Sequence, residues 1–199
     1  MKNCERDHFL EIQMRVGTRL KTLNKMKPSD LQPNEYAPYF ETYINQVSDE
    51  YSLVEELEIS VHRLIKFVQN IPLDKFDYRY AEGKWTLKDI LQHLIDTERI
   101  LAYRALRIAR NDQTPLPGFD ENRYVDFAHA NQREINELME EFKLVRQSTI
   151  HLFRTFSNEQ LALMGTASDK LVSVRAIGFI ISGHQNHHAN VFKERYLDV

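Results

Sequence analysis

Two histidines near the C-terminus, His184 and His188, are the residues whose type and spacing best predict chemistry. At about 100° per residue they lie on one face of a helix, together with the apolar Ile177, Ile181 and Val191. An imidazole within an apolar stripe costs free energy unless its nitrogens find polar partners, and a divalent metal suits this i, i+4 spacing. The alternative is a pair of core histidines that hydroxyl or carbonyl groups satisfy. We expect a metal site, which then needs a third ligand.

The third ligand is marked less clearly by the residues alone. His93 lies on the flank of the apolar stripe of an earlier helix, on the same side as Ile90, and is the leading candidate. His62 has a similar position beside Val61 and remains an alternative. The other histidines are expected at the surface or at the edge of the site: His8, His129, His151 and His187.

Charged residues on the helix of His93 form a second group of candidates. Glu98 falls inside the apolar stripe, between Leu94 and Leu101, where a carboxylate needs a charge partner, a hydrogen bond or a metal. We favour a structural salt bridge, to Arg175 or to an arginine of the same helix, over a role as a catalytic base. Four arginines form a basic strip that is either a solvated face or an attraction for an anionic substrate: Arg99, Arg104, Arg107 and Arg110.

Composition excludes several classes of protein. The 199 residues contain a single cysteine, Cys4, so neither an internal disulfide framework nor a multi-cysteine zinc module can form. A net charge of −3 lacks the bulk basic footprint of a nucleic-acid-binding protein. No apolar stretch approaches the roughly 18 residues of a membrane helix, and no signal peptide is visible. These features predict a soluble cytoplasmic protein that binds neither nucleic acid nor membrane.

The elements that must position these residues are helices. Apolar residues recur at intervals of three and four in four segments, and no segment alternates clearly enough to predict a strand. Thr86 and Asp89 form a capping box before one segment, and Asn131 with Glu134 is expected to cap another. The predicted helices cover about 48–70, 86–110, 131–156 and a range from 173 onward. Helices with one apolar face each bury those faces against one another, so we predict an all-α four-helix bundle.

Residues 111–130 form the longest connection between these helices. A helix of 25 residues is about 37 Å long, whereas 20 extended residues reach more than about 60 Å. This link can therefore cross the whole bundle and make the second and third helices parallel. Residues 1–30 show no continuous stripe and are expected to be an N-terminal extension, flexible or with one short helix over 8–23. The bundle domain is then 31–199.

Several motifs resemble the DinB/YfiT-like family. They are the segment from Gly83-Lys-Trp-Thr through His93 to Glu98, the segment 104–110, the segment 115–120 and Gly183-His-Gln-Asn-His-His188. The resemblance covers about residues 31–199 and includes Asn34-Glu-Tyr-Ala-Pro-Tyr-Phe40. It implies an up-down-down-up four-helix bundle with a divalent metal bound by His93, His184 and His188. It also implies a homodimer.

The same resemblance suggests an enzyme, because family members with assigned chemistry include thiol-dependent ones such as bacillithiol-type S-transferases. We expect three imidazoles to hold Zn²⁺, Ni²⁺ or a similar ion and to leave a position open for substrate. The leading expectation is metal activation of a low-molecular-weight thiol toward a small-molecule substrate, and metal-dependent hydrolysis is the neighbouring one. The alternative is a non-catalytic stress-response protein that binds a metal or a small ligand.

Overall fold

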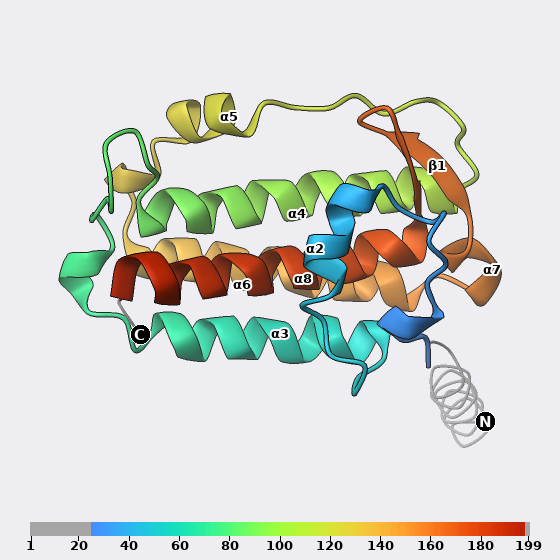
Figure 1. Cartoon of the computed structure of the whole chain (residues 1–199), viewed down its shortest axis with the longest axis horizontal. Coiled ribbons are helices and arrows are strands. Elements are labelled where there is room, and N and C mark those ends of the chain that lie inside the picture. The colour runs from blue at the N-terminus through green and yellow to red at the C-terminus, as the bar shows by residue number, and fades with distance from the viewer. Residues whose placement is uncertain (1–24, 198–199) are drawn as a thin grey trace, which may run out of the picture.

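Four long helices dominate the computed structural model, which describes residues 25–197. They are α3 (Leu53–Val68), α4 (Leu87–Ala109), α6 (Ile135–Arg154) and α8 (Val174–Phe192). Helices α3 and α8 run in one direction, and α4 and α6 run in the opposite one (Figure 1). The predicted all-α bundle with up-down-down-up topology is therefore confirmed.

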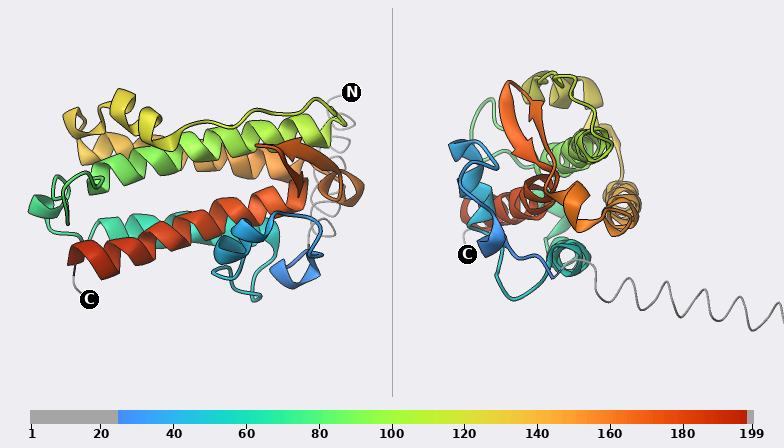
Figure 2. Two further views of the ribbon diagram at one scale, coloured as in Figure 1. Left: turned by 45° about the horizontal axis from the view of Figure 1, so that its top comes forward. Right: turned by 90° about the vertical axis from the view of Figure 1, so that its right-hand side faces the viewer.

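The packing of the four helices follows from their apolar stripes. Both α3 and α4 pack against α6 and against α8, so α3 and α4 occupy opposite corners of a square, as the end-on view in Figure 2 shows. The core divides into two clusters along the bundle axis. One includes Leu57, Phe153 and Ile177, and the other includes Leu91 and Phe142. The long sides of α4 and α8 are consequently in direct contact, which decides where their histidines meet.

Helix starts coincide with polar caps. The Thr86 hydroxyl accepts from the Asp89 amide at 3.1 Å, and the Asp89 carboxylate accepts from the Thr86 amide at 2.9 Å, as predicted. The prediction for α6 was wrong, because that helix begins after Glu134 with a capping box to Glu137. Asn131 instead bridges Thr86 and Asp89, at 2.7 Å and 3.0 Å, and so ties the start of α4 to the crossover. Helix α3 likewise begins later than predicted, after a capping box at Ser52.

The predicted crossover returns along the length of α4 and lets α4 and α6 run in parallel (Figure 1). It is not a continuous loop, because it contains α5 (Glu121–Ala128) and the 3₁₀ turn η4 (Ala130–Gln132). The Asp120 carboxylate caps α5 by accepting from the Arg123 amide at 3.1 Å. The crossover therefore covers one side of α4 with ordered backbone.

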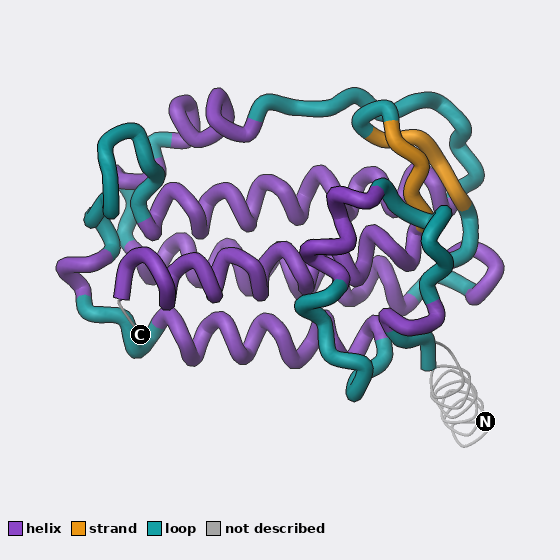
Figure 3. The backbone as a smooth tube through the Cα atoms, viewed as in Figure 1, coloured by secondary structure: helices purple, strands orange, loops and turns teal. Residues whose placement is uncertain are grey.

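A small β-hairpin contradicts the expectation that the chain has no strands. Strand β1 (Met164–Ala167) pairs antiparallel with β2 (Lys170–Ser173), at the end of the bundle where α8 begins (Figure 3). The two turn residues, Ser168 and Asp169, have φ values of 51° and 60°, as a type I′ turn requires. Strands of four residues are too short for alternation to stand out in a sequence.

The segment before α3 lies against the bundle. Helix α2 (Glu41–Ile44) packs on α8, the Leu53 amide donates to the Met26 carbonyl at 2.9 Å, and Ser29 donates to Asp49 at 2.8 Å. Cys4, His8 and the helix predicted over 8–23 lie outside the described residues, and the boundary at residue 30 stays a prediction. The remaining short elements are η1 (Pro28–Asp30), η2 (Pro38–Phe40), η3 (Leu73–Lys75), α7 (Asn158–Leu161) and the π-helical turn η5 (Lys193–Leu197). Within residues 25–197, no helix is long and apolar enough to cross a membrane.

Candidate metal centre

Three histidines converge where α4 faces α8. The Nε2 atom of His184 lies 3.0 Å from Nε2 of His93 and 3.0 Å from Nε2 of His188. Each of the three residues offers a ring nitrogen within 4.8 Å of the other two. The i, i+4 spacing aligns the two histidines of α8, and the contact between α4 and α8 adds His93. The structure thus brings together the three residues that the sequence predicts as metal ligands.

The chemistry of these nitrogens fits a metal better than it fits the histidines themselves. A neutral imidazole carries one N–H, so three Nε2 atoms that face one another cannot all be satisfied by mutual hydrogen bonds. Bonds of about 2.0–2.1 Å in tetrahedral geometry separate ligand nitrogens by about 3.3 Å, close to the two 3.0 Å separations here. Imidazole donors suit zinc, nickel, copper and iron. The residues present therefore fit a divalent cation.

Burial keeps these histidines neutral. His93 and His184 are only 7% and 6% exposed, and His188 is half-buried. Burial lowers the pKa of His93 to about 4. It also holds the pKa values of His184 and His188 well below their ordinary range, with a smaller contribution from the neighbouring histidines. Metal ligation requires the neutral ring, so at neutral pH few protons need to be displaced.

The Nδ1 atoms, which point away from the centre of the cluster, have few hydrogen-bond partners. Nδ1 of His93 lies 3.4 Å from the Thr97 hydroxyl, which is four residues along α4 and orients the ring. Nδ1 of His188 is buried without a hydrogen-bond partner among the described residues. His187 lies outside the cluster, with its Nδ1 3.4 Å from the Gln46 amide nitrogen, which agrees with a place at the edge of the site.

A cavity of about 380 Å³ adjoins the cluster and is lined by both His93 and His184. Its walls come from α2, α4, α8, the crossover and the β-hairpin. A site with three protein ligands and an adjoining cavity has room for a substrate at the remaining coordination position. Other lining residues include Tyr39, Phe40, Tyr43, Thr97, Leu101, Arg104, Phe119, Glu121, Ser168, Lys170 and Ile180.

Tyr43 is a site residue that the sequence did not single out. Its ring packs edge-on against His184 with the ring centroids 5.1 Å apart, and its hydroxyl lies 2.7 Å from that of Tyr39. Burial raises the pKa of Tyr43 above its usual value, so the phenol remains a hydrogen-bond donor. Gly183 permits this approach, because a Cβ there would lie 2.1 Å from the Tyr43 carbonyl oxygen. The spacing of residues within α8 carries no signal for a contact with α2.

Glu98 is placed in a buried ion pair rather than in the cavity. Arg146 of α6 donates from Nε and Nη2 to the two carboxylate oxygens at 2.8 Å and 2.9 Å, and both side chains are buried. The predicted partner was wrong, because Arg175 pairs with Glu35 and no arginine of α4 reaches Glu98. The packing of α4 against α6 decides this pairing, and no spacing within α4 could reveal it. The catalytic role considered for Glu98 stays a prediction, and the geometry favours the structural one.

The competing histidines lie elsewhere. His62 and His151 are exposed and line a surface groove between α3 and α6. His129 is exposed at the left-handed C-cap of α5. Within the part of the chain that the structure describes, the three converging histidines are the only group of three or more histidine, cysteine or acidic residues that could hold a metal.

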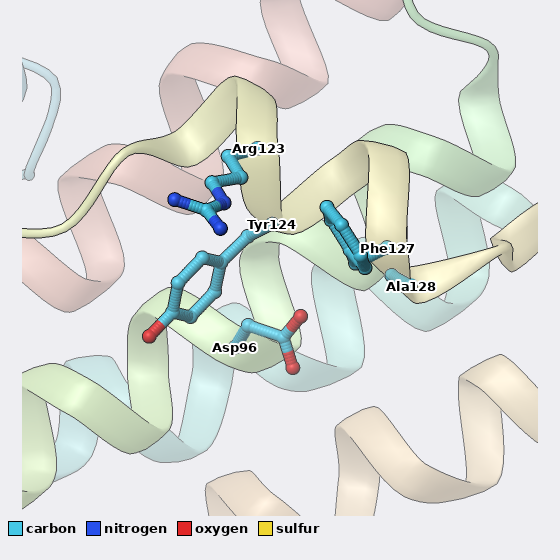
Figure 4. A pocket seen from close by; sticks show the side chains of 5 residues that line it. All are labelled: Asp96, Arg123, Tyr124, Phe127 and Ala128. Carbon is cyan, nitrogen blue, oxygen red and sulfur yellow. The ribbon is translucent and has the colours of Figure 1, made fainter.

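A second cavity, of about 390 Å³, lies between α4 and α5 and is drawn in Figure 4. It is lined by Asp96, Arg123, Tyr124, Phe127 and Ala128. Burial raises the pKa of Asp96 above its ordinary value. One carboxylate and no histidine make this cavity a poorer candidate for metal chemistry than the one beside His93.

Comparisons with known proteins agree with this architecture. The model of the DinB superfamily matches residues 56–192. A protein of Oceanobacillus iheyensis, named as a candidate metal-dependent hydrolase, is 24% identical over 79 residues, which are 39% of this chain and 45% of that protein. The chain thus matches less than half the length of that relative.

The fold is shared with a solved structure. YfiT from Bacillus subtilis, described as a candidate metal-dependent hydrolase with an unusual four-helix bundle topology, superposes with a TM-score of 0.66 at 17% identity. The match covers 73% of this chain and 85% of YfiT. At that identity the likeness concerns the fold alone. Since the family model spans well over half of the sequence, the chain belongs to the DinB superfamily.

Proposed function

We propose that this protein is a metal-dependent enzyme in which His93, His184 and His188 hold a divalent cation such as Zn²⁺ or Ni²⁺. The observation that carries the proposal is the convergence of three neutral Nε2 atoms beside a cavity. Such an ion, when bound, acts as a Lewis acid that polarises the substrate or lowers the pKa of a nucleophile. The names of the relatives, as candidate metal-dependent hydrolases, support the same class of chemistry.

The chain's own residues supply binding and orientation. Thr97 orients the His93 ring, and the Tyr43 hydroxyl is a donor at the edge of the site. Apolar side chains of the cavity, including Phe40, Leu101 and Ile180, exclude water from a bound small molecule. Glu98 contributes indirectly, because its pair with Arg146 fixes α4 against α6.

We infer two candidate reactions for this site. One is hydrolysis, and the other is S-transfer from a low-molecular-weight thiol. In the second, the sulfur comes from a cofactor or substrate, since the only cysteine of the chain is Cys4, in the N-terminal region. The cytoplasmic location and the homodimer stay predictions.

Metal analysis tests the site directly. Plasma mass spectrometry of the purified protein is expected to find close to one metal ion per chain. The content should collapse in His184→Ala and in His188→Ala and persist in His62→Ala, which removes an exposed histidine of α3. Stoichiometric metal in both α8 variants would contradict the proposed ligand set.

Turnover tests the function. The metal-loaded protein is incubated with ester, amide and electrophile panels, each with and without an added thiol. Thiol-independent cleavage indicates the hydrolase, and thiol-dependent consumption of an electrophile indicates the transferase. Metal-loaded protein that binds a thiol but converts no substrate would support a non-catalytic binding role instead.

A further inference from the structure

Arg104 is a buried cation whose partners are all neutral. It is 6% exposed, and its Nη2 atom donates to the Pro117 carbonyl at 2.8 Å and to the Ser168 hydroxyl at 2.9 Å. Its guanidinium carbon lies 5.9 Å from the centre of the Phe119 ring. Among the described residues, no carboxylate lies within ion-pair distance, and Nε and Nη1 have no hydrogen-bond partner. A buried charge without a counterion costs free energy, so its retention requires a reason.

The other buried arginine of the described residues, Arg146, and the partly buried Arg175 do have counterions. Arg146 pairs with Glu98, and Arg175 pairs with Glu35. The basic strip predicted on α4 also divides, since Arg99 pairs with Glu141 and Arg107 pairs with Asp112. Arg110, the fourth arginine of the strip, is exposed. Only Arg104 of this strip lines the histidine cavity.

Helix geometry aims Arg104 at the cavity that contains His93. The two residues are 11 positions apart, which corresponds to about three turns and leaves them about 20° apart around the α4 axis. Their Cα atoms are separated by about 16 Å along that axis. Both side chains line one continuous cavity, so a ligand that reaches from one to the other must be elongated.

The charged residues that line the cavity sum to one positive charge. Lys170 and Glu121 contribute one charge of each sign, so the excess charge is that of Arg104. Phe40, Leu101 and Ile180 give the cavity an apolar component. This lining suits a molecule with an apolar body and a single anionic end.

We propose that the cavity binds an elongated organic anion whose terminal carboxylate or phosphate pairs with Arg104. This inference deepens the proposed function and rests on it for the other end of the substrate, which would lie at the three histidines. Arg104 acts as a binding residue that selects and aligns the substrate, remote from the reacting atoms. Charge-assisted hydrogen bonds to a desolvated guanidinium are among the strong polar contacts that proteins make.

The test uses three probes with the same eight-carbon chain: octanoate, octyl phosphate and the neutral octanamide. Binding is measured by isothermal titration calorimetry on the full chain in EDTA, so that no metal is required. At least one anion should bind about tenfold or more tightly than octanamide. The anion that does so shows whether the cavity prefers a carboxylate or a phosphate as the terminal group. If both anions bind no more tightly than octanamide, or none binds at millimolar concentration, the inference is overturned.

Variants assign the effect to Arg104. Arg104→Gln should erase the preference for the anion, Arg104→Lys should retain part of it, and Arg107→Gln should leave it unchanged. Arg104→Met, which keeps an aliphatic stem against Phe119, replaces the Gln variant if circular dichroism shows that the latter is unfolded. A preference that survives in the neutral variants, or that disappears only in Lys170→Gln, contradicts the inference. Because these measurements need no metal, a failure of the three-histidine proposal would leave them interpretable.

Discussion

Two buried polar clusters share helix α4 and differ in how their groups are satisfied: one joins α4 to α6 and α3, and the other joins α4 to α8. In the ion-pair cluster, Arg146 donates to both oxygens of Glu98, to the Ser60 hydroxyl at 2.6 Å and to the Leu57 carbonyl at 3.2 Å. In the histidine cluster, three Nε2 atoms face one another and open onto a cavity. The first cluster is satisfied within the protein, whereas the second holds ring nitrogens that cannot all be satisfied by one another, which is why we propose a metal ion there.

The comparison distinguishes structural from functional burial of polar groups. The ion-pair cluster fixes α3, α4 and α6 relative to one another, but it leaves no donor or acceptor free to bind a ligand. Buried polar groups without partners lower the free energy of unfolding, and an ion that binds them raises it again. Arg104, which lines the same cavity, follows the same rule, since its contacts among residues 25–197 are neutral and include no counterion.

The largest expected effect is on the ion-pair cluster. Arg146→Met leaves the Glu98 carboxylate buried without a partner and should lower the free energy of unfolding by about 3–5 kcal/mol, measured by urea denaturation. The double variant Glu98→Leu, Arg146→Met should recover much of that loss, because no charge is then left unpaired. A single variant as stable as the wild type would show that the cluster is not structural.

A smaller effect is expected from the histidine cluster. A metal at about 100 times its dissociation constant should stabilise the wild type by about 2.7 kcal/mol and should leave His184→Ala unchanged. Thermal or urea unfolding with and without the metal measures the difference, and His151→Ala, which removes an exposed histidine of α6, is the control. Equal stabilisation of the His184→Ala variant would place the metal elsewhere.

In the metal-free protein, the buried histidines should also make the free energy of unfolding depend on pH. The folded-state pKa of His93 is lowered from 6.5 to about 4, so the unfolded chain binds more protons between these values and stability falls as pH decreases through this window. His93 alone should cost about 1.4 kcal/mol by about pH 5.5, with no change expected above about pH 7.5. Urea midpoints across this range in EDTA provide the measurement, and His93→Gln should reduce the slope, with the remainder due to His184 and His188, whose pKa values are also lowered. An unchanged slope in that variant would exclude His93 as its source.

The smallest effect is expected at the surface of the same helices. Arg99 pairs with Glu141 at the half-exposed junction of α4 and α6, where water screens the charges. Arg99→Gln should change the free energy of unfolding by no more than about 0.5 kcal/mol, and metal content should not change. A loss of stability comparable to that of Arg146→Met would mean that burial does not explain the different contributions of the two ion pairs.

Local signals in the sequence accounted for much of the fold. The capping box at Thr86 marked where α4 begins, because caps act within one turn of a helix. The predicted start of the fourth helix at 173 agrees with α8, whose N-cap is Ser173. The hairpin was missed because its strands are short and its turn uses Ser168 and Asp169 at positive φ rather than the usual glycine or asparagine. The later start of α6 was missed because Asn131 has a tertiary partner instead of a capping role.

The sequence by itself determined the helical periodicity, the long crossover and the histidine pair of α8, since each depends on spacing within one segment. His93 was the leading candidate for the third ligand from its place on its helix, the family resemblance selected it over His62, and the packing of α4 on α8 placed it beside that pair. Only the tertiary structure decided that Arg146 satisfies Glu98, that Tyr43 reaches His184 over Gly183, and that Arg104 faces the cavity with no counterion in the described part of the chain. The physical reason is that burial and partner choice are properties of contacts between segments, which no single helix contains.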